Sequence, residues 1–287
     1  MKAFNVSRGA IIIGCPGTSN NFLPGVNPDI NNVKKFLQSD KGGSWNTDEI
    51  ILLDNPSEQR VNQVIANTKK DYLLIYFSGH GYTDLRKRRM ISLKDNSIPD
   101  TNLLNDSPRQ LVIIDACRNF VSSGIGGLDI QAEGSDNFES FSTYDFFSEQ
   151  IMLSPYGKII VHSTQSGYSS YDTRDGGVFT TNLLKVSTRM ISEFEYQPCN
   201  IQTLLKFVPQ FISSSGFKQS PMIAYTTGNL SVPFALTISE FEKQQRALPN
   251  NSKPESINSN FENFVNAALL TLALVCVVGA IASGSKS

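Results

Sequence analysis

The stretch YLLIYFSGHG at residues 72–81 is an unbroken apolar run that ends in Ser-Gly-His-Gly. The stretch LVIIDACRN at residues 111–119 has the same organisation, with a shorter apolar run followed by Asp-Ala-Cys-Arg-Asn. Short apolar runs rich in branched side chains are typical of strands buried on both faces of a parallel sheet. Each stretch therefore predicts a buried strand with polar, chemically reactive residues at its carboxyl end.

Similar runs recur along the chain and alternate with helical patterns. Three further buried strands and one weaker candidate are predicted at residues 9–14, 49–54, 158–161 and 220–227. Apolar residues at helical spacing lie at residues 27–37, 56–65, 179–191 and 201–212. This alternation predicts a three-layer α/β fold, in which helices flank a mostly parallel six-stranded sheet. We expect one domain of this kind over residues 1–238.

The composition excludes several classes of protein. The 25 basic and 26 acidic residues nearly cancel, so no overall field attracts nucleic acid. Four cysteines without a CxxC pair and only two histidines argue against both a zinc site and a disulfide scaffold. We therefore expect no metal site, no nucleic-acid partner and a reducing compartment.

The C-terminal part of the chain has a different composition. Residues 239–263 are polar and contain Pro249 and Pro254, which predicts a linker. Residues 264–282 carry no charge, and as a helix these 19 residues would span about 28 Å, close to the thickness of a bilayer core. A buried core helix is the alternative, but the run lacks a polar face. We expect a single-pass C-terminal transmembrane anchor, with the catalytic domain facing the cytoplasm because the N-terminus shows no signal-peptide pattern.

The two decisive strands bring a histidine and a cysteine to one edge of the sheet. Reactive groups of an open α/β sheet gather at the carboxyl ends of its strands, where His80 and Cys117 lie. A thiolate nucleophile needs an imidazole base and N–H donors for the oxyanion. The N–H groups of Gly81 and Cys117 are the natural donors. His162 is the competing base, but it follows a different strand and has no flanking glycines.

Together, YFSGHG and IIDACRN resemble the caspase-like cysteine peptidases, in particular the metacaspase and bacterial caspase-like branch. The histidine lies 37 positions before Cys117, and Asp115 and Asn119 stand where caspases have glutamine and glycine, whereas Asp-Ala-Cys is the metacaspase form. The resemblance covers about residues 8–190, including LPG…D-x-x-N-V at 23–33 and GGVFT at 176–180. It implies Cys117 as nucleophile and His80 as base and then acid, with no required third member and no required cofactor.

Charge predicts the specificity of such a peptidase. Asp115 would repel an acidic side chain at P1, the residue before the scissile bond, and attract arginine or lysine. Metacaspases generally use a second acid after the fifth strand, which Asp172 or Asp175 would supply. The alternatives are that Asp115 only binds nearby backbone amides and that Asp172 is a solvated loop acid. We expect an S1 pocket formed by Asp115 and Asp172, and cleavage of protein substrates after Arg or Lys.

A run of basic residues and a stretch of acidic residues indicate how such a peptidase could be activated by self-cleavage or by calcium. Arg86, Lys87, Arg88 and Arg89 form either a solvated hairpin or a self-cleavage site for an enzyme with this preference. Residues 121–155 contain six acids and no Lys or Arg, so a basic-specific enzyme has no site there. We expect a single chain, or one nicked near Arg89. The acids of this stretch would either be solvated or offer oxygen ligands to calcium as an activator.

These patterns predict a membrane-anchored cysteine endopeptidase, and the family association extends by analogy to cell death or defence. One alternative is a catalytically silent, membrane-bound scaffold, against which the intact His80 and Cys117 argue. Another is a pore-forming effector whose hydrophobic tail is triggered by the peptidase domain. Caspases pair through a sixth strand and metacaspases mostly stay monomeric, so residues 220–227 leave a homo-oligomer open.

Overall fold

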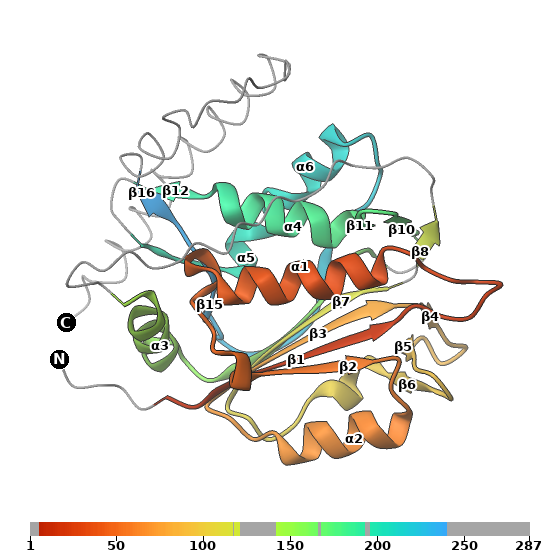
Figure 1. Ribbon diagram of the computed structural model, residues 1–287, viewed down its shortest axis with the longest axis horizontal. Coiled ribbons are helices and arrows are strands. Elements are labelled where there is room, and N and C mark those ends of the chain that lie inside the picture. The colour runs from red at the N-terminus through yellow and green to blue at the C-terminus, as the bar shows by residue number, and fades with distance from the viewer. Residues whose placement is uncertain (1–5, 117, 121–141, 166–167, 193–195, 240–287) are drawn as a thin grey trace.

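The computed structural model describes residues 6–116, 118–120, 142–165, 168–192 and 196–239. A central six-stranded sheet lies between helices on both of its faces (Figure 1). Its strands follow the order β14-β9-β7-β3-β1-β2. They are β1 (Arg8–Cys15), β2 (Ile50–Asp54), β3 (Tyr72–Gly79), β7 (Arg109–Asp115), β9 (Gly157–His162) and β14 (Met222–Gly228). Only the edge strand β14 is antiparallel to its neighbour, which confirms the predicted mostly parallel sheet.

The period of two along each strand divides the core between the two faces of the sheet. In β1, Ile12 packs in the larger cluster beneath α1 (Val26–Gln38) and α4 (Val178–Arg189). Its neighbour Ile11 packs in the smaller cluster, which also includes residues of α2 (Glu58–Asn67). Figure 1 shows α1, α4 and α6 above the sheet and α2 below it. The three predicted layers are therefore confirmed.

The predicted helix over residues 201–212 is wrong as a single helix. Two short helices, α5 (Ile201–Leu204) and α6 (Val208–Ser214), replace it. Pro209 is the second residue of α6 and has no N–H to continue a preceding helix. The break falls where proline is tolerated, in the first turn of the second helix.

Smaller elements complete the described chain. The hairpin sheet β4-β5-β6 follows β3, and α3 (Thr143–Leu153) lies at one end of the central sheet (Figure 1). The remaining strands are β4 (Gly81–Thr83), β5 (Arg89–Ser92), β6 (Ser97–Pro99), β8 (Arg118–Phe120), β10 (Ser170–Thr173), β11 (Gly176–Gly177), β12 (Ile191–Ser192), β13 (Pro198–Asn200), β15 (Pro233–Leu236) and β16 (Ile238–Ser239). Short 3₁₀ helices cover Asp40–Gly42, Thr47–Glu49 and Asp100–Leu103.

The predicted linker at 239–263 and the predicted anchor at 264–282 lie beyond Ser239, the last described residue. Within residues 6–239, as far as the structure describes them, no helix has both the length and the apolar character needed to cross a bilayer.

Candidate active site

The carboxyl ends of β3 and β7 lie side by side and carry the predicted reactive groups. The two strands pair in parallel register, with Ser78 opposite Asp115. His80 follows β3 directly, and Figure 1 shows this edge of the sheet near β4 and β8. Cys117 itself lies outside the described residues, but Ala116 before it is buried, and β8 begins directly after it at Arg118. β7, which ends at Asp115 beside the end of β3, therefore leads into Cys117 from the edge of the sheet that carries His80.

A backbone carbonyl orients the imidazole of His80. Nε2 of this half-buried histidine lies 2.5 Å from the carbonyl oxygen of Asn21, in the loop between β1 and α1. Because a carbonyl can only accept, Nε2 carries the proton and Nδ1 is left with a free lone pair to act as a base. Sequence analysis missed this partner, since a main-chain oxygen has no signature in the sequence.

The loop that supplies this carbonyl is held in a tight conformation. The Asn21 side-chain oxygen accepts hydrogen bonds from Thr18 N at 2.8 Å and from Thr18 Oγ1 at 3.1 Å. Gly17 has a φ of +84°, and a Cβ there would lie 2.8 Å from Nε2 of His80. Glycine is therefore required at position 17 both for its backbone conformation and for the approach of the histidine.

Gly81 begins β4 directly after the histidine. Ser92 N donates to the carbonyl oxygen of His80 at 3.0 Å, while Gly81 stands opposite Ile91 in the antiparallel pair. Hydrogen-bonded and non-hydrogen-bonded pairs alternate in such a ladder, so the Gly81 N–H points away from β5. It is thus directed out of the hairpin, as an oxyanion donor needs to be.

Three fully buried carboxylates form a second group near the same edge, which we call the carboxylate cluster (Asp29, Asp115 and Asp172). Asp115 accepts hydrogen bonds from Thr180 Oγ1 at 2.7 Å, Ser170 Oγ at 3.1 Å and Thr180 N at 3.2 Å. Asp172 accepts from the backbone N–H of Gly25 at 3.0 Å. The N–H groups of Gly25 and Thr180 belong to the starts of α1 and α4, where the helix dipole favours negative charge.

Asp29 is the member of the carboxylate cluster that sequence analysis did not identify as a site residue. It lies in the first turn of α1 and accepts hydrogen bonds from Gly177 N at 2.8 Å and Ser78 Oγ at 2.9 Å. Gly177 also stands opposite Asp172 in the pairing of β10 with β11, which brings the carboxylates together. The sequence did offer a signal for Asp29, because an acidic residue stands there in a predicted helical turn among residues that face the core. The other predicted acid, Asp175, lies half-buried outside the cluster.

His162 lies on the other face of the sheet. It stands opposite Ile114 in the pairing of β9 with β7, and Ile114 belongs to the core cluster on the α2 side. Its Nε2 lies 2.7 Å from Oδ2 of Asp100, and both side chains are largely buried. Burial lowers the pKa of His162, the charge of Arg89 adds to this, and the hydrogen bond to Asp100 opposes it. His162 is therefore engaged in a buried pair of its own.

Protonation of His162 is expected to destabilise the fold. Its pKa is lowered below the ordinary value of 6.5, so the unfolded chain binds more protons below that pH. The free energy of unfolding should therefore fall as the pH drops below about 6.5, by up to about 1 kcal/mol per pH unit. Urea titrations between pH 5 and about 8 measure this slope. His162→Gln should have a shallower slope than the wild type in the same buffers, and an equal slope would refute the assignment.

The basic run lies in the turn between β4 and β5. Arg86, Lys87 and Arg88 are exposed, and Nε of Arg88 donates to Asp84 at 2.8 Å. Arg89 is half-buried and donates from Nη1 to the carbonyl oxygen of Thr164 at 3.1 Å. The run therefore combines a solvated hairpin turn with one arginine that binds the loop after β9.

The acidic stretch at 121–155, for which solvated acids and calcium ligands are the two alternatives, lies largely outside the described residues, which include only its last part from Ser142. Within the described ranges, no group of three Asp, Glu, His or Cys side chains is arranged to hold a metal ion.

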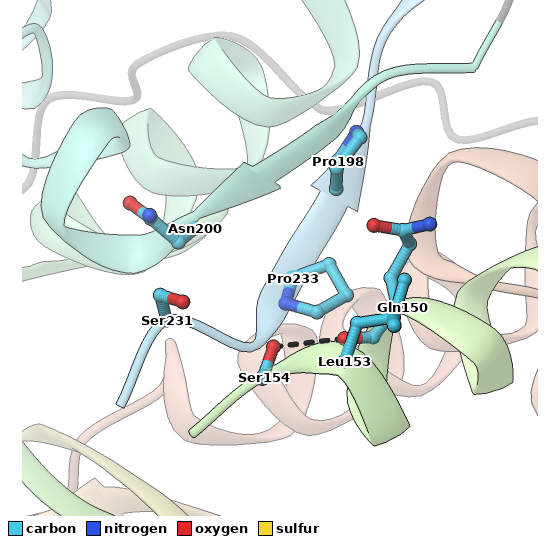
Figure 2. Close-up of a pocket in the computed structure, with 7 residues that line it drawn as sticks. All are labelled: Gln150, Leu153, Ser154, Pro198, Asn200, Ser231 and Pro233. Carbon is cyan, nitrogen blue, oxygen red and sulfur yellow. Dashed lines mark hydrogen bonds between the residues drawn. The ribbon is translucent and has the colours of Figure 1, made fainter. Parts of the chain in front are cut away.

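Two of the cavities on the described surface differ in their surroundings. One, of about 250 Å³, lies between the end of α3 and the pair β13 and β15 (Figure 2). None of its lining side chains is titratable; they are Gln150, Leu153, Ser154, Pro198, Asn200, Ser231 and Pro233. The other, of about 360 Å³, lies against His80. Of these two, the second adjoins His80, the predicted base.

Comparisons with known proteins agree with this geometry. The profile of the caspase-domain peptidases matches residues 7–230. A crystal structure of caspase-1 from Spodoptera frugiperda superposes with a TM-score of 0.51 at 21% identity, covering 82% of this chain and 92% of that one. A protein from Geobacter sulfurreducens superposes with a TM-score of 0.50 at 16% identity, covering 82% of this chain and 100% of that one. The sequence matches no curated protein at a significant level.

Proposed function

The chain belongs to the caspase-domain peptidase family, and from that premise we propose that it is a membrane-anchored cysteine endopeptidase that cleaves proteins after arginine or lysine. Family membership implies a cysteine peptidase, and hence protein substrates. The observation that carries the mechanism is the hydrogen bond between His80 and the Asn21 carbonyl, because it leaves a basic nitrogen at the sheet edge that leads into Cys117.

The proposed reaction proceeds through an acyl-enzyme. His80 Nδ1 takes the proton of the Cys117 thiol, and the thiolate attacks the carbonyl carbon of the scissile peptide. The N–H groups of Gly81 and Cys117 donate to the resulting oxyanion. As the C–N bond breaks, His80 returns its proton to the leaving amine. Water, deprotonated by His80, then attacks the thioester, which releases the acid product and restores the thiol.

The carboxylate cluster supports specificity for a basic P1 residue. Three acids, Asp29, Asp115 and Asp172, share one region beside the ends of β3 and β7. Each carboxylate oxygen can accept more than one hydrogen bond, so an oxygen already bound to a backbone amide can also receive a guanidinium donor. Such charge-assisted bonds are about twice as strong as neutral ones. An acidic P1 side chain would be repelled at the same place.

The membrane part of the proposal depends on the sequence alone. The uncharged residues 264–282 would anchor the protein, and residues 239–263 would link the anchor to the peptidase domain. This arrangement would restrict cleavage to proteins that reach the membrane surface, and a role in cell death or defence follows by analogy with the family.

Cleavage of fluorogenic peptides by the detergent-solubilised full chain tests the proposal. Peptides with Arg or Lys at P1 should be cleaved, and Cys117→Ala should lower kcat/KM by at least about 10³-fold, since the nucleophile is lost. Cys199→Ala is the matched control, because Cys199 is buried in β13, away from this edge of the sheet. Each assay is run with and without calcium.

Each other outcome has a defined meaning. Cleavage only after Asp would retain the peptidase but refute the role of the carboxylate cluster. A self-cleavage product that ends within residues 121–155 would refute it as well, because that stretch has no basic residue. Inactivity of the wild type under all conditions would contradict the proposed peptidase activity and favour a catalytically silent scaffold.

A further inference from the structure

Four separate segments line a cavity that we call the His80 cavity, and one of them is His80 itself, directly after β3. The end of β1 and the loop after it contribute Cys15, Gly17, Thr18 and Asn21, the loop after β2 contributes Asn55, and the hairpin between β5 and β6 contributes Ser92, Leu93 and Lys94. Its volume of about 360 Å³ lies within the range of about 300–1,000 Å³ that is typical of small-molecule sites.

Backbone hydrogen bonds hold the outer wall of the cavity in place. Asn55 N donates to the carbonyl oxygen of Gly14 at 2.7 Å, and Asn55 has a φ of +44°. Lys94 N donates to the carbonyl oxygen of Pro56 at 3.1 Å, which joins the β5–β6 hairpin to the loop after β2. The main chain of these two loops is therefore fixed relative to β1 and to each other.

The order of the strands places this cavity on the side of His80 that faces β1 and β2, away from β7. In the central sheet β3 has β7 on one side, which leads to Cys117, and β1 and then β2 on the other. The His80 cavity lies at the ends of β1 and β2, so His80 stands between the cavity and the segment of the nucleophile. In the proposed reaction His80 protonates the leaving amine, and the leaving segment must therefore pass next to its ring.

From this juxtaposition we propose that the His80 cavity binds the side chain that follows the scissile bond, and that it selects polar or acidic side chains over basic ones. This inference rests on the proposed function and extends it to the other side of the cleaved peptide bond. The occupant is thus the P1′ residue of a protein substrate, or P2′ where P1′ is small.

The chemistry of the lining supports this selectivity. Lys94 is the only Lys or Arg among the lining residues, and no Asp or Glu lines the cavity. The amides of Asn21 and Asn55 and the hydroxyl of Ser92 offer hydrogen-bond donors for a carboxylate or an amide. Burial, together with the charge of nearby Asp54, raises the pKa of Cys15 to about 12, so its thiol is neutral. Asp54 itself is exposed and does not line the cavity.

Internally quenched peptides test the inference on the full chain. The peptides share Arg at P1 and differ only at P1′, which is Glu, Gln, Gly or Lys, and kcat/KM is measured for each. The wild type should cleave the Glu peptide about fivefold faster than the Lys peptide. Lys94→Glu and Asn55→Asp change the charge of the cavity from two different loops, and each should reduce or invert this ratio. Lys69→Glu is the matched control, since Lys69 is exposed and precedes β3 at the opposite end of the strand.

The outcomes separate this inference from the proposed function. A fluorogenic substrate with Arg at P1 and a dye as the leaving group reports the reaction without an amino-acid side chain at P1′. If that substrate is cleaved but the Glu-to-Lys ratio is near one, or is the same in Lys94→Glu as in Lys69→Glu, the inference is wrong and the proposed function stands. If neither the fluorogenic nor the quenched substrates are cleaved, both are wrong.

Discussion

His80→Ala is expected to reduce kcat/KM for substrates with Arg at P1 by about 10³-fold or more, because general acid–base catalysis contributes about 10²–10⁴-fold and thiol activation is lost with it. No second histidine can take over. The only other one, His162, is paired with Asp100 on the α2 side of the sheet.

His162→Gln is the matched control for this experiment. It also removes an imidazole, but from a buried pair outside the proposed site, so it should affect stability more than kcat/KM at pH 7.5. Equal losses of kcat/KM in both variants, with both proteins folded, would contradict the assignment of the base to His80.

The largest effect on stability is expected for Arg8→Ala, which should lower the free energy of unfolding by about 3–5 kcal/mol. Arg8 opens β1 and is 1% exposed. Its Nε donates to Glu49 at 2.9 Å and its Nη2 to the carbonyl oxygen of Ser44 at 3.1 Å. The guanidinium also lies over the rings of Tyr144, at 3.9 Å from the centroid, and Trp45, at 4.7 Å. Alanine would leave Glu49 largely buried without this partner and would open a gap between the rings.

Urea unfolding of the full chain in detergent measures this loss. Arg60→Ala is the matched control, since Arg60 is exposed on α2, and it should change the free energy of unfolding by less than about 0.5 kcal/mol. The double variant Arg8→Met with Glu49→Gln removes both charges and should be more stable than Arg8→Ala. A change of less than about 1 kcal/mol in Arg8→Ala would show that the buried ion pair contributes little.

The parallel strands could be predicted because burial on both faces leaves near-continuous apolar runs. The edge strand β14 was placed only approximately, at 220–227 instead of Met222–Gly228, because most of its residues are exposed and follow no apolar run. In the same way, the periodicity of residues 201–212 indicated a helix, but it did not show that Pro209 divides it in two.

Some residues of the candidate site could likewise be predicted from the sequence, and others could not. His80 directly follows the apolar strand β3 and Asp115 ends the apolar strand β7, so their place at the sheet edge could be predicted from the sequence. Asp29 and the carbonyl of Asn21 reach the site from α1 and the loop before it, through contacts that depend on the packing of α1. The Asn21 oxygen belongs to the main chain, so no side chain marks it.

The main-chain origin of that oxygen has a consequence for how the loop tolerates change. Any amino acid at position 21 supplies a carbonyl, but the Asn21 side chain also holds the loop through Thr18, so a substitution there preserves the acceptor for His80 only where the loop keeps its path. Position 17 has no such freedom, because its left-handed backbone and the nearby imidazole exclude a side chain. The orientation of the histidine therefore depends also on a glycine that makes no hydrogen bond to its ring.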